Sequence, residues 1–383
     1  MTTQPQRIRA VHTHVLDAAL SEPFAYSRAW YARRGAMLVE IETEDGLTGW
    51  GEAYGPARLT APAVEFLRDA LIGEDANCTE AIWQRLYSNW RDHGQKGILI
   101  EAISAIDIAL WDIRGKAAGV PAHCLLGGPI RTSVRAYATG LYRRQRDDHE
   151  HYLREEAAQY VAQGYHAVKL KIGFDTDHDA RMTRAVRAEI GDVGLMVDAN
   201  HAWDASAAIR YARQVEAYDI AWFEEPVPPE DIAGYLQVKN SISIPIAGGE
   251  CEYTRMGHRE LLTRRAVDIL QPDICAAGGL SECKKIADMA WAFGVRYVPH
   301  VWGTGIGIAA SLQLLAVLPH NAVALTSVEP VLEFDQTEHP IRQAILQTPL
   351  LAQDGVVAIP QGPGLGIEID RTALRRFRIG GSA

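Results

Sequence analysis

The chain has 383 residues, of which 48% are hydrophobic and 22% are charged, a composition typical of a folded protein with a large core. Its formal net charge of −10 argues against a general nucleic-acid binder, because no surplus of basic side chains is present to neutralise phosphates. The five cysteines are scattered without a C-x-x-C pair, which favours the reduced thiols of a cytoplasmic protein over a disulfide framework or a zinc cluster.

Signals for export or for a membrane span are not evident. The first seven residues lack the apolar core of a signal peptide, and the most apolar long run, 305–318, is too short to cross a bilayer. We therefore expect a cytoplasmic protein that acts on a small molecule, with no nucleic-acid or membrane partner.

The first 130 residues predict an α+β domain. Residues 7–19 and 37–43 have strand character, and Asp45-Gly46 is a strong hairpin turn that leads into a third strand over 47–52. Helical periodicity follows over three ranges: 61–72, 78–92 and 98–118. Two irregular segments, 21–35 and 53–60, interrupt this pattern, and we expect them to cover a binding site.

From about residue 134 the sequence alternates between strands and helices up to Val328. The strand-end landmarks are 23–29 residues apart, close to one βα unit, and lie at residues 171, 198, 224, 250, 273, 300 and 329. With a strand over 134–139 this makes eight units, which predicts a (β/α)₈-type barrel over 131–360, because a doubly wound sheet would normally stop at five or six strands. The tail, 361–383, is expected to return to the N-terminal domain.

Three short apolar runs each end in a carboxylate, Asp198, Glu224 and Glu250, and consecutive members are 26 residues apart. Equal spacing places them at matching ends of successive parallel strands, where the active sites of barrels lie. At about 4 Å and an effective dielectric of about 20, each pair repels by about 4 kcal/mol, so a cation is expected between them. Oxygen ligands favour Mg²⁺ over Zn²⁺, with one ion per subunit.

Candidates for proton transfer follow on neighbouring strands. Lys169 and Lys171 alternate along one strand and point to the same face, where close ammonium groups lower each other's pKa and allow one to act as a base. His300 ends a later strand and Asp273 ends the strand before it, which predicts a dyad. Glu329 ends the last predicted strand.

Two other motifs are better explained structurally. The segment 147–151 is rich in Asp, Glu and His but precedes a predicted helix, which indicates a solvated acidic N-terminus. Glycines 303, 305 and 307 resemble a phosphate loop but lack the context of a dinucleotide-binding βα unit. We expect them to form a turn in the floor of the site.

The combined pattern resembles the enolase superfamily, in its mandelate racemase subgroup. The residues that carry the resemblance are Lys169-x-Lys171, Asp198-x-Asn200, Glu224-Glu225-Pro226, Gly249-Glu250, Asp273, His300, Glu329 and the helix motif over 105–112. The resemblance implies a capping domain over 1–130 and Mg²⁺ bound by the three carboxylates. It also implies that Lys171 and His300 form the acid/base pair, with Asp273 orienting His300. Lys169 would contact the substrate carboxylate and Glu329 the developing enediolate.

Four further segments resemble the members of that subgroup that open the lactone of a sugar diacid: 91–97, 135–140, 299–305 and 329–335. The resemblance implies removal of the proton α to a carboxylate, followed by β-elimination to a 3-deoxy-2-keto hexarate. Two alternatives stay open, namely dehydration of an acid sugar and racemisation or epimerisation of a 2-hydroxy acid. A non-catalytic barrel is disfavoured because all ligands and bases are present. Relatives in the subgroup are commonly oligomeric, so a homo-oligomer is expected.

Recognition of the distal part of the substrate is expected from the segments over the barrel mouth. Tyr26, Tyr54, Asn200 and Trp302 form the predicted substrate-binding set. The accompanying arginines suit a polyhydroxylated acid, although each one alone is as easily explained as a solvated surface residue: Arg28, Arg33, Arg34 and Arg58.

Overall fold

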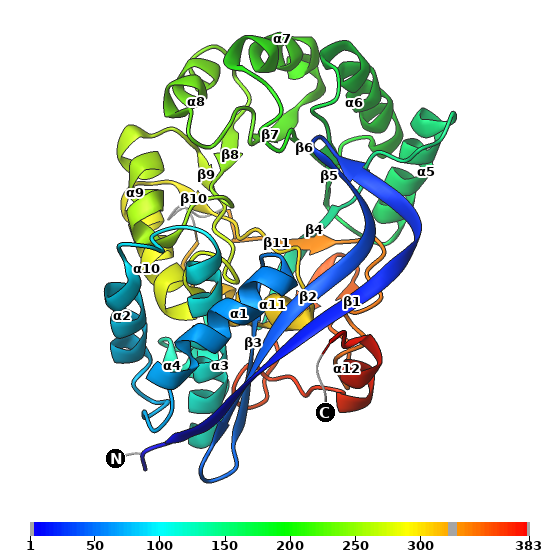
Figure 1. The fold of residues 1–383 in the computed structure, drawn as a ribbon. Helices are drawn as coiled ribbons and strands as arrows, with labels where there is room; N and C mark the ends of the chain where they lie inside the picture. Colours follow the sequence, from blue (N-terminus) through cyan, green and yellow to red (C-terminus); the bar gives the residue numbers. More distant parts are fainter. Residues whose placement is uncertain (1–3, 321–327, 381–383) are drawn as a thin grey trace.

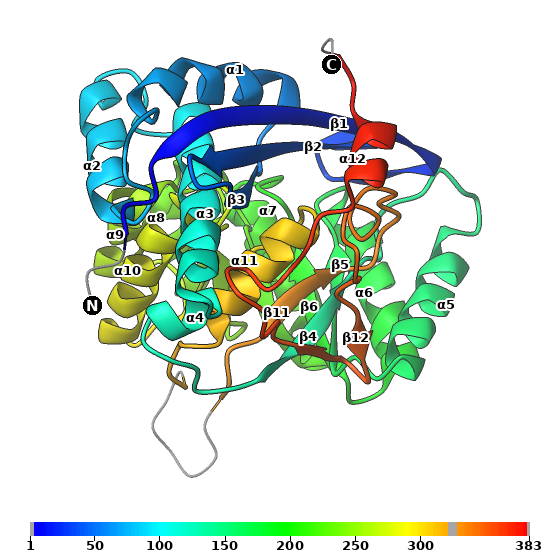
Figure 2. The same cartoon turned by 90° about the horizontal axis from the view of Figure 1, so that it is seen from below.

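The computed structural model describes residues 4–320 and 328–380, which form two packed parts (Figures 1 and 2). The N-terminal part contains an antiparallel three-stranded sheet, and the larger part contains a parallel sheet surrounded by helices. Figure 1 shows the parallel strands as a ring seen from one end, with β1 and β2 crossing in front of it. The predicted fold class, a (β/α)₈-type barrel with an N-terminal α+β capping domain, is confirmed.

The N-terminal part is built on a long β-hairpin. β1 (Ile8–Tyr26) pairs antiparallel with β2 (Ala29–Thr43), and β2 pairs with β3 (Thr48–Ala53). The predicted turn joins β2 to β3, and Gly46 there takes a left-handed conformation, with φ 91°. The helices of this part are α1 (Ala57–Leu67), α2 (Thr79–Trp90), α3 (Ile98–Ala118) and α4 (Ala122–Leu125), with a 3₁₀ turn over Arg68–Ala70.

Helix α3 is buried along most of its length because it lies between the three-stranded sheet and the barrel. Gly51 on β3 permits the close approach, since a Cβ there would lie 1.8 Å from the Ala105 carbonyl oxygen. On the barrel side, the backbone N–H and the hydroxyl of Ser281 donate to Asp107 at 2.9 and 2.6 Å. This helix therefore joins the two parts.

Within the described residues, eight parallel strands form the larger part: β4 (Ser133–Thr139), β5 (Ala167–Lys171), β6 (Gly194–Asp198), β7 (Ile220–Glu224), β8 (Ile246–Gly248), β9 (Ile269–Leu270), β10 (Arg296–Tyr297) and β11 (Leu332–Asp335). Neighbours from β4 to β10 pair in chain order, and β11 pairs with β4. No ladder joins β10 to β11 in the described ranges, but the Val301 N–H donates to Glu333 at 3.0 Å there.

The helices that alternate with these strands surround them (Figure 1). They are α5 (His149–Ala162), α6 (Thr176–Ile190), α7 (Ala205–Val215), α8 (Ile232–Lys239), α9 (Thr254–Arg264), α10 (Gly279–Ala292) and α11 (Gly305–Leu315), with a 3₁₀ turn over Glu216–Tyr218. Helix α5 begins at His149, so the acidic segment 147–151 lies at a helix N-terminus, as the sequence indicated.

Two predicted boundaries are wrong. The segment 21–35 is not an irregular loop, because Phe24 pairs with Tyr31 and the hairpin continues almost to its tip. The last barrel strand, β11, begins after Glu329 instead of ending there. The prediction assumed a nearly constant spacing between strands, whereas the connection between β10 and β11 is longer than the others. The predicted alternation up to Val328 falls partly on residues 321–327, which lie outside the described residues.

The glycine-rich turn after His300 holds the capping part on the barrel. Glu52, on β3, is buried and accepts hydrogen bonds from the Thr304 N–H at 2.8 Å, the Thr304 hydroxyl at 2.7 Å and the Gly307 N–H at 2.9 Å. These donors lie at the start of α11, whose positive end favours an anion. The turn thus binds a carboxylate of the chain itself, which explains the likeness to a phosphate loop.

The C-terminal residues contact both parts. β12 (Ala352–Gln353) pairs with β13 (Val356–Ala358), which pairs with β4. In α12 (Arg371–Phe377), Arg371 forms an ion pair with Glu40 on β2, and beyond it the Ile379 N–H donates to the Val15 carbonyl at 2.9 Å. The division into 1–130, 131–360 and 361–383 stays a prediction. None of the helices in the described residues is long and apolar enough to cross a membrane.

Candidate active site

Alternation along the barrel strands places charged side chains above a hydrophobic layer. Ala167, Met196 and Trp222 belong to one buried apolar cluster inside the barrel. Two residues later on the same three strands come Lys169, Asp198 and Glu224, all of them buried. Because side chains on one face of a strand recur every second residue, this second layer points into the same interior, nearer the carboxyl ends.

The two predicted lysines lie among carboxylates. Lys169 Nζ is 2.7 Å from Glu333, 2.5 Å from Glu224 and 3.6 Å from Asp198. Lys171 pairs with Asp198 and donates to the Asn200 side-chain oxygen at 3.1 Å. This network brings together residues from β5, β6, β7 and β11.

We expected each of the two lysines to lower the pKa of the other, but the pKa of Lys171 is raised. Burial and the neighbouring Lys169 do lower the pKa of Lys171, but Asp198 outweighs them and raises it above its usual value. In this arrangement Lys171 is an ammonium. A cation bound to Asp198 would weaken this effect, so the predicted role of Lys171 as a base depends on the predicted role of Asp198 as a metal ligand.

Glu329 is not part of this network, and Glu333 takes the position predicted for it. Glu329 is exposed, three residues before β11 begins, whereas Glu333 on β11 is buried and lines the cavity. Besides Lys169, Glu333 accepts hydrogen bonds from the Thr139 hydroxyl at 2.6 Å and the Val301 N–H at 3.0 Å. Burial raises the pKa of Glu333, but Lys169 and His300 outweigh it and lower that pKa to about 2.

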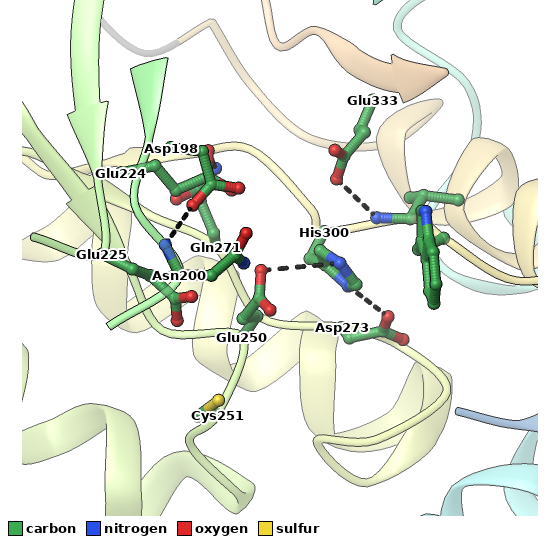
Figure 3. Close-up of polar contacts among 12 residues, drawn as sticks. Asp198, Asn200, Glu224, Glu225, Glu250, Cys251, Gln271, Asp273, His300 and Glu333 are labelled. Carbon is green, nitrogen blue, oxygen red and sulfur yellow. Dashed lines mark hydrogen bonds and ion pairs between the residues drawn. The ribbon is translucent and has the colours of Figure 1, made fainter. Parts of the chain in front are cut away.

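His300 and Asp273 lie as the predicted dyad requires (Figure 3). His300 Nδ1 is 2.7 Å from Asp273 Oδ2, and Asp273 also accepts a hydrogen bond from the Cys275 N–H at 2.6 Å. The other ring nitrogen of His300 lies 3.5 Å from Glu250. Burial lowers the pKa of His300, but Glu250 and Asp273 outweigh it and raise that pKa to about 10.

A second group of metal-binding side-chain types shares Glu250. His201, Glu225, Glu250 and Cys251 each bring one ligand atom to within 4.8 Å of the others, and His201 lies 2.8 Å from Glu225. Sequence reasoning missed three of the four, because a residue that follows a strand end normally points to the opposite face. His201 and Glu225 instead have left-handed backbones, with φ 64° and 45°, so alternation no longer predicts their direction. The sequence held one indication of their role: His201 directly follows Asn200, and Glu225 directly follows Glu224.

One cavity collects the four predicted substrate-binding residues, Tyr26, Tyr54, Asn200 and Trp302. It spans about 610 Å³, a volume that includes open solvent at its mouth. Lysine, histidine and carboxylate groups of the site line it as well: Lys171, His201, Glu250, His300 and Glu333. The remaining lining residues are Arg28, Tyr31, Tyr142 and Cys251. Of these four, Arg28 alone was expected to contact the substrate.

The arginines of the hairpin have different positions. Arg28 lines the cavity, whereas Arg34 is buried outside it, with its guanidinium 3.7 Å from the centre of the Trp302 ring. Arg34 also donates to the Trp302 carbonyl at 2.9 Å and pairs with Asp335 at 3.4 Å. Arg33 is exposed and pairs with Asp17. The expectation that Arg33 and Arg34 face the substrate is therefore corrected, because both are engaged by carboxylates of the chain.

Two family models match the chain over these same elements. The mandelate racemase / muconate lactonizing enzyme N-terminal domain matches residues 9–127, and the enolase C-terminal domain-like model matches residues 152–373, more than half of the chain. The chain belongs to the mandelate racemase / muconate lactonizing enzyme family.

Relatives in this family include enzymes of sugar acids. The chain is 50% identical to the D-galactarolactone cycloisomerase of Agrobacterium fabrum, over 97% of this chain and 99% of that protein. It is 37% identical to the arabinonate dehydratase of Saccharolobus solfataricus, over 89% of this chain and 90% of that protein. A racemase from Streptomyces coelicolor, solved with bound magnesium, is 30% identical with a TM-score of 0.87, covering 97% of this chain and all of the other.

In this member of the mandelate racemase family, Asp198, Glu224 and Glu250 fit a hard divalent cation. All three are buried, and Glu250 Oε2 has no hydrogen-bond partner within the described ranges, although His300 lies 3.5 Å away. Burial and neighbouring carboxylates raise the pKa of Glu224 and of Glu250 to about 7, even though Lys169 lies 2.5 Å from Glu224. Figure 3 shows Glu250 between the Asp198–Glu224 group and His300.

Proposed function

We propose that this protein removes the proton α to a carboxylate of a sugar acid with the help of one Mg²⁺ ion, and that its substrate is galactarolactone. The placement of Lys171 and His300 in one cavity, with Glu250 and Glu333 beside them, is the observation that carries the reaction type. The relative at 50% identity, a D-galactarolactone cycloisomerase, supports the choice of substrate.

Asp198, Glu224 and Glu250 would hold the metal ion. When bound, Mg²⁺ supplies positive charge to the substrate carboxylate as the enediolate forms, the type of electrostatic stabilisation that usually contributes most to such a reaction. Lys169 is positioned to add a second cation, since its ammonium lies between Glu224 and Glu333. Glu333 would orient that ammonium, and its other oxygen accepts the N–H of Val301, the residue after His300.

Lys171 and His300 would move the protons. Either group, in its neutral form, can take the α-proton, and the configuration at the α-carbon decides which one does. Asp273 holds the Nδ1 side of His300, so Nε2 is the nitrogen that faces the cavity and exchanges the proton. A general acid or base placed in this way contributes about 10²–10⁴-fold to the rate.

An acid-sugar dehydratase is the second candidate. The ring oxygen of a lactone leaves as a carboxylate, which needs little help from an acid, whereas dehydration expels hydroxide and requires a proton. Asp273, 2.7 Å from Nδ1 of His300, would stabilise a protonated imidazole that can act as this acid, and the arabinonate dehydratase relative agrees with it. Racemisation or epimerisation would use the same two groups without a leaving group.

The test is incubation with Mg²⁺ and a panel of galactarolactone, open hexaric acids and aldonic acids, followed by NMR and pH-stat titration. Ring opening should give a keto acid and release one proton per turnover, because a new carboxyl group ionises. Dehydration of an open acid would release water and no net proton. Turnover of the open acids alone would refute the cycloisomerase proposal, and deuterium exchange without net product would favour a racemase. Lys171→Ala and His300→Asn should each lose at least one proton-exchange activity while keeping the circular dichroism of the fold.

We also propose that the protein is a cytoplasmic homo-oligomer, on the basis of the family resemblance and the scattered cysteines. Sedimentation equilibrium of the purified chain measures its mass in solution, and a monomer at all concentrations would contradict the first part. Fractionation of cells that express the full chain would test the second part.

A further inference from the structure

Arg28 is the basic side chain of the cavity that forms no ion pair with a carboxylate in the described part of the chain, although the charge of Glu225 acts on it from farther away. The other basic side chains that line the cavity pair with carboxylates: Lys171 with Asp198, His201 with Glu225 and His300 with Asp273. Arg28 lies over Tyr26, whose ring centre is 5.8 Å from the guanidinium carbon. A planar guanidinium without such a partner, at the edge of a cavity, is suited to bind an anionic group of a ligand.

The hairpin tip that carries Arg28 is attached to the rim of the barrel. Ala25 exchanges backbone hydrogen bonds with Arg143 at 2.8 and 3.0 Å, and the Ser27 hydroxyl donates to the Ala199 carbonyl at 2.8 Å. Ala199 directly follows β6, and Figure 1 shows the tip reaching toward β5 and β6. Gly173 permits this contact, since a Cβ there would lie 2.7 Å from the Ser27 Cβ. Arg28 is therefore held beside the cavity by contacts with the segments that follow β4 and β6.

Opening a sugar-acid lactone by β-elimination creates an anion at the end of the substrate away from the reacting carboxylate. A base takes the α-proton, the electrons of that C–H bond form the α,β double bond, and the bond from the β-carbon to the ring oxygen breaks. The departing oxygen stays bonded to the lactone carbonyl, so the leaving group is a carboxylate. The enol then gains a proton at the β-carbon as its hydroxyl proton leaves, and the proton held by the base passes to solvent.

We propose that Arg28 binds the lactone carbonyl and stabilises the carboxylate that this group becomes when the ring opens. This inference rests on the proposed function. It places Arg28 at the end of the substrate away from the reacting carboxylate, where an anion forms during the reaction. The lactone carbonyl is neutral at the start and gains charge as the bond breaks. The contact with Arg28 is therefore stronger in the transition state than in the ground state, which is the kind of interaction that raises kcat.

The experiment compares wild type with Arg28→Met and Arg28→Lys, and uses Arg33→Met as a matched control on the same hairpin, because Arg33 is paired with Asp17. Each protein is supplied with Mg²⁺ and galactarolactone in D₂O, and NMR follows both deuterium entry at the α-carbon and formation of the keto acid. In Arg28→Met the kcat of ring opening should fall about 10²-fold, as when one donor to a developing anion is removed.

Exchange of the α-proton should continue in Arg28→Met, so that the ratio of exchange to ring opening rises. Arg28→Lys should recover part of the rate, and Arg33→Met should behave as wild type. An unchanged ring-opening rate in Arg28→Met, or a loss of exchange and opening in equal proportion with normal circular dichroism, would overturn the role of Arg28. If the wild-type protein does not open galactarolactone, the proposed function itself is wrong, and that result is visible before any variant is compared.

Discussion

The Nζ atom of Lys169 lies 2.7 Å from Oε1 of Glu333, and both side chains are buried. This contact joins β5 to β11, two strands that flank β4 on opposite sides. It places a carboxylate from the last barrel strand beside the lysine that would contact the substrate. Glu329, which the sequence pattern had assigned to that position, is exposed.

Replacement of Glu333 therefore provides a direct test of the site. Glu333→Gln should lower kcat by about 10²-fold or more, because the amide no longer provides a charged partner that orients Lys169. The fold should persist, since Lys169 keeps its contact with Glu224. Glu329→Gln is the matched control and should have wild-type kcat and circular dichroism. A loss confined to Glu329→Gln would contradict the placement of β11.

The proposed metal site predicts a loss of affinity when one ligand charge is removed. Glu224→Gln keeps the size of the side chain but should weaken Mg²⁺ binding by at least about 10-fold to 100-fold, measured by isothermal titration calorimetry. Wild-type protein treated with EDTA should lose turnover and recover it on addition of Mg²⁺. Unchanged Mg²⁺ affinity together with full activity in Glu224→Gln would rule out this residue as a ligand.

Arg34 should act on the substrate through Trp302. The guanidinium lies over the Trp302 ring and bonds its carbonyl, so Arg34→Met should lower stability by about 1–3 kcal/mol and raise KM more than it lowers kcat. Arg34→Lys keeps the charge but loses the planar stack and should show a smaller version of the same effect. Kinetics and urea unfolding of both variants, with Arg33→Met as control, check this. An unchanged KM in Arg34→Met would refute the link to Trp302.

Glu40 should make stability depend on pH in the acid range. Burial raises its pKa, but hydrogen bonds with His14 and Arg371 outweigh this and lower the pKa of Glu40 from 4.5 to about 2. The folded chain thus holds this proton less tightly than the unfolded chain. The stabilisation is complete above about pH 4.5 and is lost as the pH falls toward 2.

Glu40→Gln should therefore be less stable than wild type near pH 7, by about 1–2 kcal/mol, and the difference should shrink as the pH falls toward 3. The value is smaller than the full shift implies, because Arg371 is 52% exposed and solvent screens the pair. Urea unfolding of both proteins at several pH values measures the difference. A gap that stays constant, or grows, toward low pH would contradict the ion pair between Glu40 and Arg371.

Much of the site follows from local sequence. The residues Asp198, Glu224 and Glu250 were identifiable because strand ends recur at a nearly constant spacing in a barrel, and because three such carboxylates repel unless a cation is near. Lys169 and Lys171 share a face because side chains alternate along a strand, a property that does not depend on the rest of the fold. The Asp273–His300 contact follows from the same adjacency of consecutive strands.

The tertiary structure decided what spacing and alternation cannot express. Because the connection before β11 is longer than the others, the carboxylate on the last barrel strand is Glu333 and not Glu329. His201 and Glu225 lie beside Glu250 because their backbones are left-handed, which alternation along a strand does not predict. Whether an arginine of the hairpin is free or paired depends on chain segments far away in sequence, as with Arg34 and Asp335. Periodic patterns report the direction of a side chain along its own element, whereas partners and charge balance are set by elements that meet only in the folded chain.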